Sequence, residues 1–206
     1  MILRIHPETP GERQLKIAVD CLRQGGVIIY PSDTVYGLGC DITQIRAVDR
    51  VAQIKGIRRE KANFSFVCSD FSQLSGYSKP IANHTFRVMR RALPGPFTFI
   101  LEATSAVPHF FQSRKKTVGI RIPDHPVPVQ IVRMLGNPIM TTSIHADDRI
   151  VDYETDPEVI HEHFKKLVDI VIDSGHCGNV PSTVVDCTTP EMIVIRQGKG
   201  ELEKYL

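Results

Sequence analysis

The segment at residues 27–39 restricts the possible folds of this chain more than any other feature of the sequence. Its first four residues, Val-Ile-Ile-Tyr, are β-branched or aromatic and predict a buried strand. Pro31-Ser-Asp-Thr34 then predicts a turn, and Gly37 and Gly39 follow at once. We expect polar groups at this strand end and glycines that let a ligand approach the main chain. In an open α/β sheet, ligands bind beyond such strand ends, although Ser-Asp-Thr could equally serve only to cap the turn.

The rest of the chain alternates between patterns typical of strands and patterns typical of helices. Apolar runs predict strands near residues 27–30, 64–68, 97–101, 117–122, 138–143, 168–172, 182–186 and 192–196. Helical periodicity and capping residues predict helices at 12–24, at about 44–55 after a cap at Asp41 or Thr43, at 80–93, at 125–135, and after Asp156. These interleaved strands and helices predict an α/β fold, a twisted open mixed sheet with flanking helices, formed by a single domain of residues 1–206.

The composition is that of a folded globular protein rather than a disordered or membrane-spanning one. The chain has 206 residues, of which 42% are hydrophobic and 23% charged, as in a folded globular protein. No apolar run reaches the roughly 18 residues of a membrane span, and the N-terminus lacks a signal-peptide pattern. Five scattered cysteines without a Cys-x-x-Cys pair are typical of a reducing compartment and do not indicate a metal site. We therefore expect a cytoplasmic protein with no membrane partner.

Basic residues are clustered although the net charge is only +2. The clusters lie at residues 55–61, at Arg87, Arg90 and Arg91, and at residues 114–116. Each alone is typical of a solvated face. If they meet around one depression of the surface, they would attract phosphate groups, and the fold we predict includes such a basic concave cavity.

The chemistry in this sequence is carried by hydroxyl and arginine side chains at strand ends. No metal-ligand cluster, nucleophile elbow, Walker loop or complete Gly-x-Gly-x-x-Gly motif is present. Hydroxyls and guanidinium groups suit a carboxylate, phosphate or carbamate ligand, although each residue alone could be a cap or a surface group. The residues at such positions are Thr34, Thr117, Arg121, Thr141, Thr142, Ser143, Ser182 and Arg196.

Five stretches resemble motifs of the YrdC/YciO family in the right order, and the resemblance runs from about residue 10 to the end of the sequence. The family includes enzymes that make threonylcarbamoyl-adenylate for tRNA modification, and its members share an α/β fold. Together the matches are specific, whereas none alone would be. The stretches are Pro-Ser-Asp-Thr-Val-Tyr-Gly-Leu at 31–38, Leu-Pro-Gly-Pro-Phe-Thr-Phe at 93–99, Val-Gly-Ile-Arg-Ile-Pro-Asp-His-Pro at 118–126, Pro-Ser-Thr-Val-Val-Asp at 181–186 and Val-Ile-Arg-Gln-Gly at 194–198.

The resemblance implies a role for each matched residue. Thr34, Arg121 and Ser182 would hold the substrate threonine, with Arg121 on its carboxylate. The residues implied for ATP or its adenylate are Asn63, Thr117, Thr141, Ser143 and Arg196. Lys55 and Arg58 would act in catalysis by neutralising the triphosphate, with Mg²⁺ entering beside the ATP substrate and no permanent cofactor. The implied reaction joins threonine, bicarbonate and ATP into L-threonylcarbamoyl-AMP and pyrophosphate, mainly by positioning and charge neutralisation.

The sequence departs from the synthase pattern at four places. The family's Lys-x-Arg is one residue longer here, at residues 55–58, and its Ser-x-Asn ends in His145. Cys68 replaces a histidine, and Ser32-Asp33 replaces the Thr-Glu of the first motif. These differences place the chain nearer the YciO branch. Three hypotheses remain: a threonylcarbamoyl-AMP synthase that also binds tRNA, a double-stranded RNA or tRNA-binding protein without synthase activity, and a regulatory nucleotide-binding domain.

Overall fold

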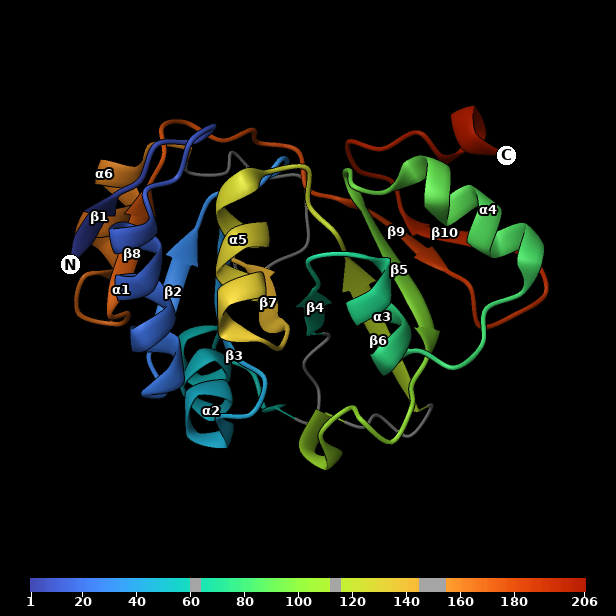
Figure 1. Ribbon diagram of the computed structural model, residues 1–206, viewed down its shortest axis with the longest axis horizontal. Helices are drawn as coiled ribbons and strands as arrows, with labels where there is room; N and C mark the ends of the chain where they lie inside the picture. Colours follow the sequence, from blue (N-terminus) through green and yellow to red (C-terminus); the bar gives the residue numbers. More distant parts are fainter. Residues whose placement is uncertain (60–63, 112–115, 145–154) are drawn as a thin grey trace.

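The computed structural model describes residues 1–59, 64–111, 116–144 and 155–206, and these form one ten-stranded sheet with helices on both faces (Figure 1). The strands are β1 (Ile2–Arg4), β2 (Val27–Tyr30), β3 (Gly37–Asp41), β4 (Ser65–Val67), β5 (Phe97–Glu102), β6 (Thr117–Arg121), β7 (Ile139–Ser143), β8 (Ile170–Asp173), β9 (Thr183–Asp186) and β10 (Ile193–Arg196). The helices are α1 (Glu12–Arg23), α2 (Ile45–Ile54), α3 (Phe71–Tyr77), α4 (Asn83–Ala92), α5 (Pro126–Leu135) and α6 (Pro157–Phe164), with 3-10 turns η2 (His109–Phe111) and η3 (Leu202–Tyr205).

The sheet is open and mixed, as the sequence predicts. Its strand order is β1-β8-β2-β3-β7-β4-β6-β5-β9-β10, so consecutive strands of the chain are often far apart in the sheet. β2 runs parallel to β8 and antiparallel to β3, while β5 runs antiparallel to β6 and parallel to β9. The four C-terminal motifs of the sequence lie on or next to β6, β5, β9 and β10, which are consecutive in the sheet.

Helices cover both faces of β2, which explains its continuous apolar sequence. Ile28 and Tyr30 belong to the cluster that contains the buried residues of α1 and α5, whereas Val27 and Ile29 belong to the cluster of α2 and α6. Alternate residues of a strand point to opposite faces, so a strand covered on both sides must be apolar throughout.

The ends of α1 and α5 follow the capping rules from which they were predicted. α1 ends before Gly25, whose φ is +81°, and α5 begins after His125, whose ring accepts a hydrogen bond from Val127. α5 ends at Gly136, with φ of +90°. Glycine is favoured there because a left-handed backbone carries no steric cost without a Cβ.

Two strands and one α-helix were not predicted, and one cap was predicted wrongly. β1 and α3 are short, and β3 contains two glycines, which are depleted in strands. The cap of α2 is Gln44 rather than Asp41 or Thr43, because the Asp41 carboxylate instead accepts hydrogen bonds from Thr43 and Asn137. Within the described part of the chain, no helix has both the length and the apolar character needed to cross a membrane.

The two glycines of β3 make room for the side chain of Tyr30. A Cβ on Gly37 would lie 2.9 Å from Cζ of Tyr30 and 3.2 Å from Oγ1 of Thr141. A Cβ on Gly39 would lie 2.6 Å from the Met140 carbonyl oxygen and 3.1 Å from Cε1 of Tyr30. The Tyr30 ring therefore lies close to both glycines. Gly37 nevertheless lines a cavity, so the expected approach of a ligand to the main chain holds there, whereas Gly39 is not a lining residue.

We expect Gly39→Ala to lower the free energy of unfolding by about 1–3 kcal/mol, because the new methyl group meets a backbone oxygen that cannot move aside. Gly76→Ala is the matched control: a Cβ on Gly76, in α3, has no neighbour within 4 Å. That control should leave stability unchanged or raise it by up to about 1 kcal/mol, because alanine favours helix. Urea unfolding measures both, and equal effects would contradict this account of β3.

Candidate functional site

A cavity of about 840 Å³ is lined by residues from the middle of the sheet and from the β2–β3 turn. Thr117, Gly119 and Arg121 alternate along β6, and Thr141 and Ser143 alternate along β7, so each set faces the same side of its strand. β4 lies between these strands, with Ser65 paired to both Gly119 and Thr141. The predicted site residues that line the cavity are Thr34, Thr117, Arg121, Thr141, Ser143, Ser182 and Arg196.

Arg121 is held by two residues of the β2–β3 turn. Its Nη2 donates to Oδ1 of Asp33 at 2.6 Å, and its Nη1 donates to Oγ1 of Thr34 at 3.2 Å. The side chains of Arg121 and Asp33 are only 11% and 9% exposed. Asp33 Oδ2 and Arg121 Nε are buried and have no hydrogen-bond partner among the described residues, so the pair is joined through a single oxygen. The sequence identified Arg121 but not its acidic partner.

The β2–β3 turn is both a capped turn and a wall of the cavity. The Ser32 hydroxyl donates to the Val35 carbonyl at 2.6 Å and accepts from the Thr34 amide at 3.2 Å. The Thr34 hydroxyl lies 3.0 Å from that of Ser32 and also accepts from Arg121, so it is engaged within the protein. Lys199 donates to the Asp33 carbonyl at 2.6 Å and attaches the C-terminal segment to the turn.

A second polar group lies where β5, β9 and β10 meet. The Ser182 and Thr98 hydroxyls are 2.9 Å apart, and Nη2 of Arg196 donates to the Ser182 carbonyl at 3.0 Å. Register pairs Arg196 with Val184, which places Arg196 on the strand next to β9. Thr98 was not predicted, although it alternates with buried Phe97 and Phe99 and could have been found from that pattern.

The predicted catalytic cations lie outside the lining of the cavity. Lys55 is buried at the end of α2, and its Nζ donates to the Ser143 carbonyl at 2.8 Å. Arg58 is exposed beyond Gly56, whose φ of +65° turns the chain away from the helix axis. Lys55 therefore makes a hydrogen bond to a lining residue of the cavity, whereas Arg58 is not a lining residue. Asn63 and His145 lie outside the described residues.

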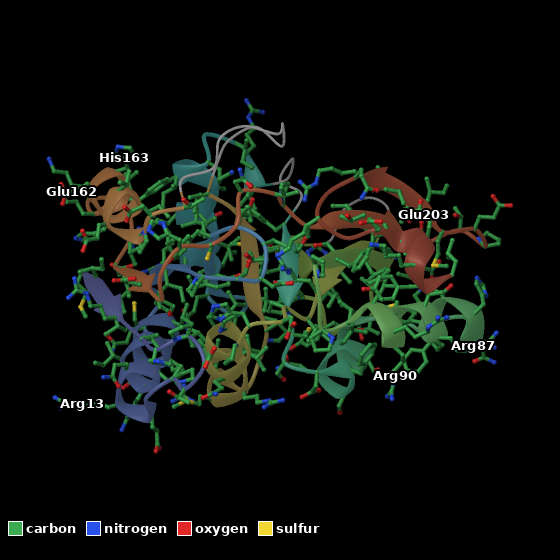
Figure 2. All side chains as sticks on the ribbon, turned by 90° about the horizontal axis from the view of Figure 1, so that it is seen from above. Arg13, Arg87, Arg90, Glu162, His163 and Glu203 are labelled. Carbon is green, nitrogen blue, oxygen red and sulfur yellow. The ribbon has the colours of Figure 1, made fainter. Side chains whose placement is uncertain are left out.

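The described part of the cavity lining contains charged, polar and apolar side chains. Its charged members in the described part of the chain are Arg121, Arg196 and Asp186. The α4 arginines are not among its lining residues, and Figure 2 shows Arg87 and Arg90 projecting outward from that helix. The basic clusters at 55–61 and 114–116 lie partly outside the described residues. An apolar portion of the lining was not predicted, and it includes Tyr30, Phe64, Ile100, Phe111, Val184 and Ile195.

Comparison with known proteins assigns the chain to a family. The model of the Sua5/YciO/YrdC family, described as "Telomere recombination", matches residues 20–198. The chain belongs to this family. YciO of Escherichia coli K12 is 38% identical over 203 residues, which are 98% of this chain and 97% of YciO. The crystal structure of E. coli YciO has a TM-score of 0.93 at 37% identity and covers 100% of this chain and 99% of that one.

The family also contains named synthases that resemble this chain. The threonylcarbamoyl-AMP synthase of Nitrosococcus oceani is 35% identical over 136 residues, 66% of this chain and 73% of that protein. The crystal structure of Pyrococcus abyssi Sua5 complexed with L-threonine has a TM-score of 0.89 at 28% identity. It matches 99% of this chain, which spans only 59% of the Sua5 chain. The family's fold is thus shared closely by a YciO protein and by a protein that binds threonine.

We expect Asp33→Ala to lower the free energy of unfolding by about 3–5 kcal/mol, because it leaves the buried Arg121 guanidinium without its counter-charge. Glu102→Ala is the control, since it breaks an ion pair with Lys79 whose side chains are more than half exposed. That exposed pair should contribute less than about 1 kcal/mol. Urea unfolding of both variants at pH 7 provides the comparison, and similar losses would show that Asp33 does not compensate a buried charge.

Proposed function

We propose that this protein makes L-threonylcarbamoyl-AMP from L-threonine, bicarbonate and ATP, and so acts in threonylcarbamoyladenosine modification of tRNA. The observation that carries the proposal is the single cavity that gathers Arg121, Arg196 and the hydroxyls of the predicted site. Its volume of about 840 Å³ lies in the range of pockets that hold small-molecule substrates and cofactors. Relatives named as threonylcarbamoyl-AMP synthases support the same substrates.

The proposed amino-acid site is built around Arg121. A guanidinium carries five N–H groups, and Asp33 and Thr34 each accept a hydrogen bond from one of its terminal nitrogens. The remaining hydrogens on those nitrogens can bind the threonine carboxylate in the planar geometry that arginine favours. Thr34 then contributes by holding Arg121, and Ser182 offers a hydroxyl on the same side of the proposed substrate.

The proposed nucleotide site uses the remaining hydroxyls and Arg196. Thr117, Thr141 and Ser143 can donate to phosphate oxygens, and the apolar lining suits a nucleobase. Mg²⁺ would enter with ATP, since it keeps several waters and binds mainly through substrate phosphates and one or two carboxylates. Asp186 is a lining carboxylate that could serve it, whereas the described residues contain no group of three His, Cys, Asp or Glu able to hold a metal.

The proposed chemistry needs no nucleophile from the protein. The threonine amine attacks bicarbonate, water is lost and a carbamate forms. A carbamate oxygen then attacks the α-phosphorus of ATP, the bond from that phosphorus to the bridging oxygen breaks, and pyrophosphate leaves. Negative charge is present on the carbamate and on the departing phosphates. Arginine and hydroxyl donors fixed in place can neutralise that charge without reorganising, which lowers the barrier.

We expect pyrophosphate release from ATP to require both threonine and bicarbonate, and Arg121→Ala to lower kcat/KM for threonine at least a hundredfold. The physical reason is the loss of charge-assisted hydrogen bonds to the carboxylate. Arg121→Lys keeps the charge but not the planar donors, and should recover only part of this loss. A coupled pyrophosphate assay measures all three proteins.

Arg13→Ala, on the exposed surface of α1 (Figure 2), is the control for that assay and should have wild-type activity. Absence of turnover in the wild type would contradict the proposed reaction. Tight ATP binding without turnover would instead support a regulatory nucleotide-binding domain. Thermal melting of each variant separates loss of activity from loss of folding.

A second candidate, binding of double-stranded RNA or tRNA without synthase activity, is favoured by the arginines of α4. Arg87, Arg90 and Arg91 are all exposed. Exposed arginines on one helix can contact successive phosphates without reading sequence. Such a surface lies apart from the cavity lining, so it is compatible with either hypothesis.

We expect Arg87→Glu to weaken tRNA binding several-fold and to reduce the slope of log K against log salt by about one. Arg13→Glu on α1 makes the same charge change at another exposed helical arginine and should alter binding less. Fluorescence anisotropy with labelled tRNA at several salt concentrations measures both slopes. Binding that does not depend on salt, or equal effects of the two variants, would contradict a role for α4.

A further inference from the structure

Tyr30 connects three strands beneath the cavity. It is the last residue of β2, it is 2% exposed, and it also lines the cavity. Its hydroxyl donates to Oγ1 of Thr141, on β7, at 2.6 Å. β3 lies between these two strands, where Gly37 pairs with Tyr30 and Gly39 pairs with Thr141. The Tyr30 ring therefore crosses β3 to reach Thr141.

The glycines of β3 allow this crossing. Gly37 and Gly39 are two residues apart and so face the same side of the sheet. A Cβ at either position would come within about 3 Å of the Tyr30 ring. Any larger residue would displace the ring and separate the two hydroxyls. The Tyr-x₆-Gly-x-Gly spacing of the sequence is thus a physical requirement of the Tyr30–Thr141 contact.

The hydrogen bond leaves the Thr141 hydroxyl able to donate. Because Tyr30 is the donor, it occupies a lone pair of Thr141 Oγ1 and not its hydrogen. No other residue in the described ranges accepts that hydrogen, and Thr141 lines the cavity. Burial raises the pKa of Tyr30 to about 12, so the phenol keeps its proton at neutral pH.

We propose that Tyr30 is a positioning residue that holds the Thr141 hydroxyl as a hydrogen-bond donor to a phosphate oxygen in the cavity. The phosphate belongs to the nucleotide of the proposed function, on which this assignment of the ligand rests. Chained hydrogen bonds polarise one another, so the Tyr30 phenol also makes the Thr141 hydroxyl a stronger donor. A donor fixed beforehand binds an anion without the cost of orienting itself.

The test is calorimetric titration of the full chain with two probes, ATP and inorganic pyrophosphate. Thr141→Val removes the proposed donor and should weaken the binding of both probes about ten- to a hundredfold. Tyr30→Phe keeps the ring over the glycines and removes only the phenol oxygen. It should weaken binding about three- to tenfold. The double variant should bind no more weakly than Thr141→Val, because Tyr30 acts through Thr141.

Two further variants separate positioning from general damage. Thr141→Ser keeps the hydroxyl and should retain most of the affinity, although its melting temperature can fall. Tyr77→Phe makes the same substitution at a tyrosine that packs edge-on against Phe66 and does not line the cavity. It should leave the affinity for both probes unchanged. A structural role alone would make affinity follow the melting temperature across the set.

The outcomes distinguish this inference from the proposed function. Wild-type affinity in Tyr30→Phe, or an equal loss when Tyr30→Phe is added to Thr141→Val, would overturn the positioning role. Binding of pyrophosphate but not ATP, with the expected weakening in both variants, would support the Tyr30–Thr141 donor and overturn the proposed reaction. Failure of the wild type to bind either anion would overturn both.

Discussion

A buried positive charge has to be balanced, and the arrangement around the cavity follows from how Arg121 is balanced. An uncompensated guanidinium in the protein interior costs several kcal/mol. Asp33 supplies the counter-charge, Thr34 accepts a further hydrogen bond, and both come from the β2–β3 turn. Lys199 attaches the C-terminal segment to the same turn. The ion pair joins the end of β6 to the β2–β3 hairpin, and the Lys199 hydrogen bond joins the last segment of the chain to the same turn.

Two features of the sheet place the other site residues in the same cavity as Arg121: the order of the strands, and the alternation of side chains between the two faces of each strand. β7, β4 and β6 are neighbours although they are separated in the sequence, and their alternate residues present hydroxyls to one side. On the opposite side, Met140, Phe66 and Ile120 of these strands belong to the hydrophobic core, which also contains buried residues of α3 and α4. Site residues from Thr34 to Arg196 can therefore line one cavity without a long loop.

Much of the fold could be predicted because local signals and burial agree. The strand at 27–30, the helix 12–24 and the helix 125–135 closed by Gly136 carry clear periodicity or caps. β3 could not be predicted in this way, since its glycines are unfavourable in strands and are explained only by the Tyr30 ring that lies across them. Asp33 and Tyr30 were missed at the site because their roles depend on partners more than 80 residues away.

The sequence by itself determined which residues could serve an anion and which family the motifs resemble. Hydroxyls and arginines at strand ends are a local pattern, so their chemistry can be recognised without coordinates. Only the tertiary structure decided that all eight of them share a cavity, that Arg58 lies outside its lining, and that Asp33 neutralises Arg121. The reason is that strand order, the crossing of β3 by Tyr30 and the pairing of buried charges join distant segments, and no local pattern records those contacts.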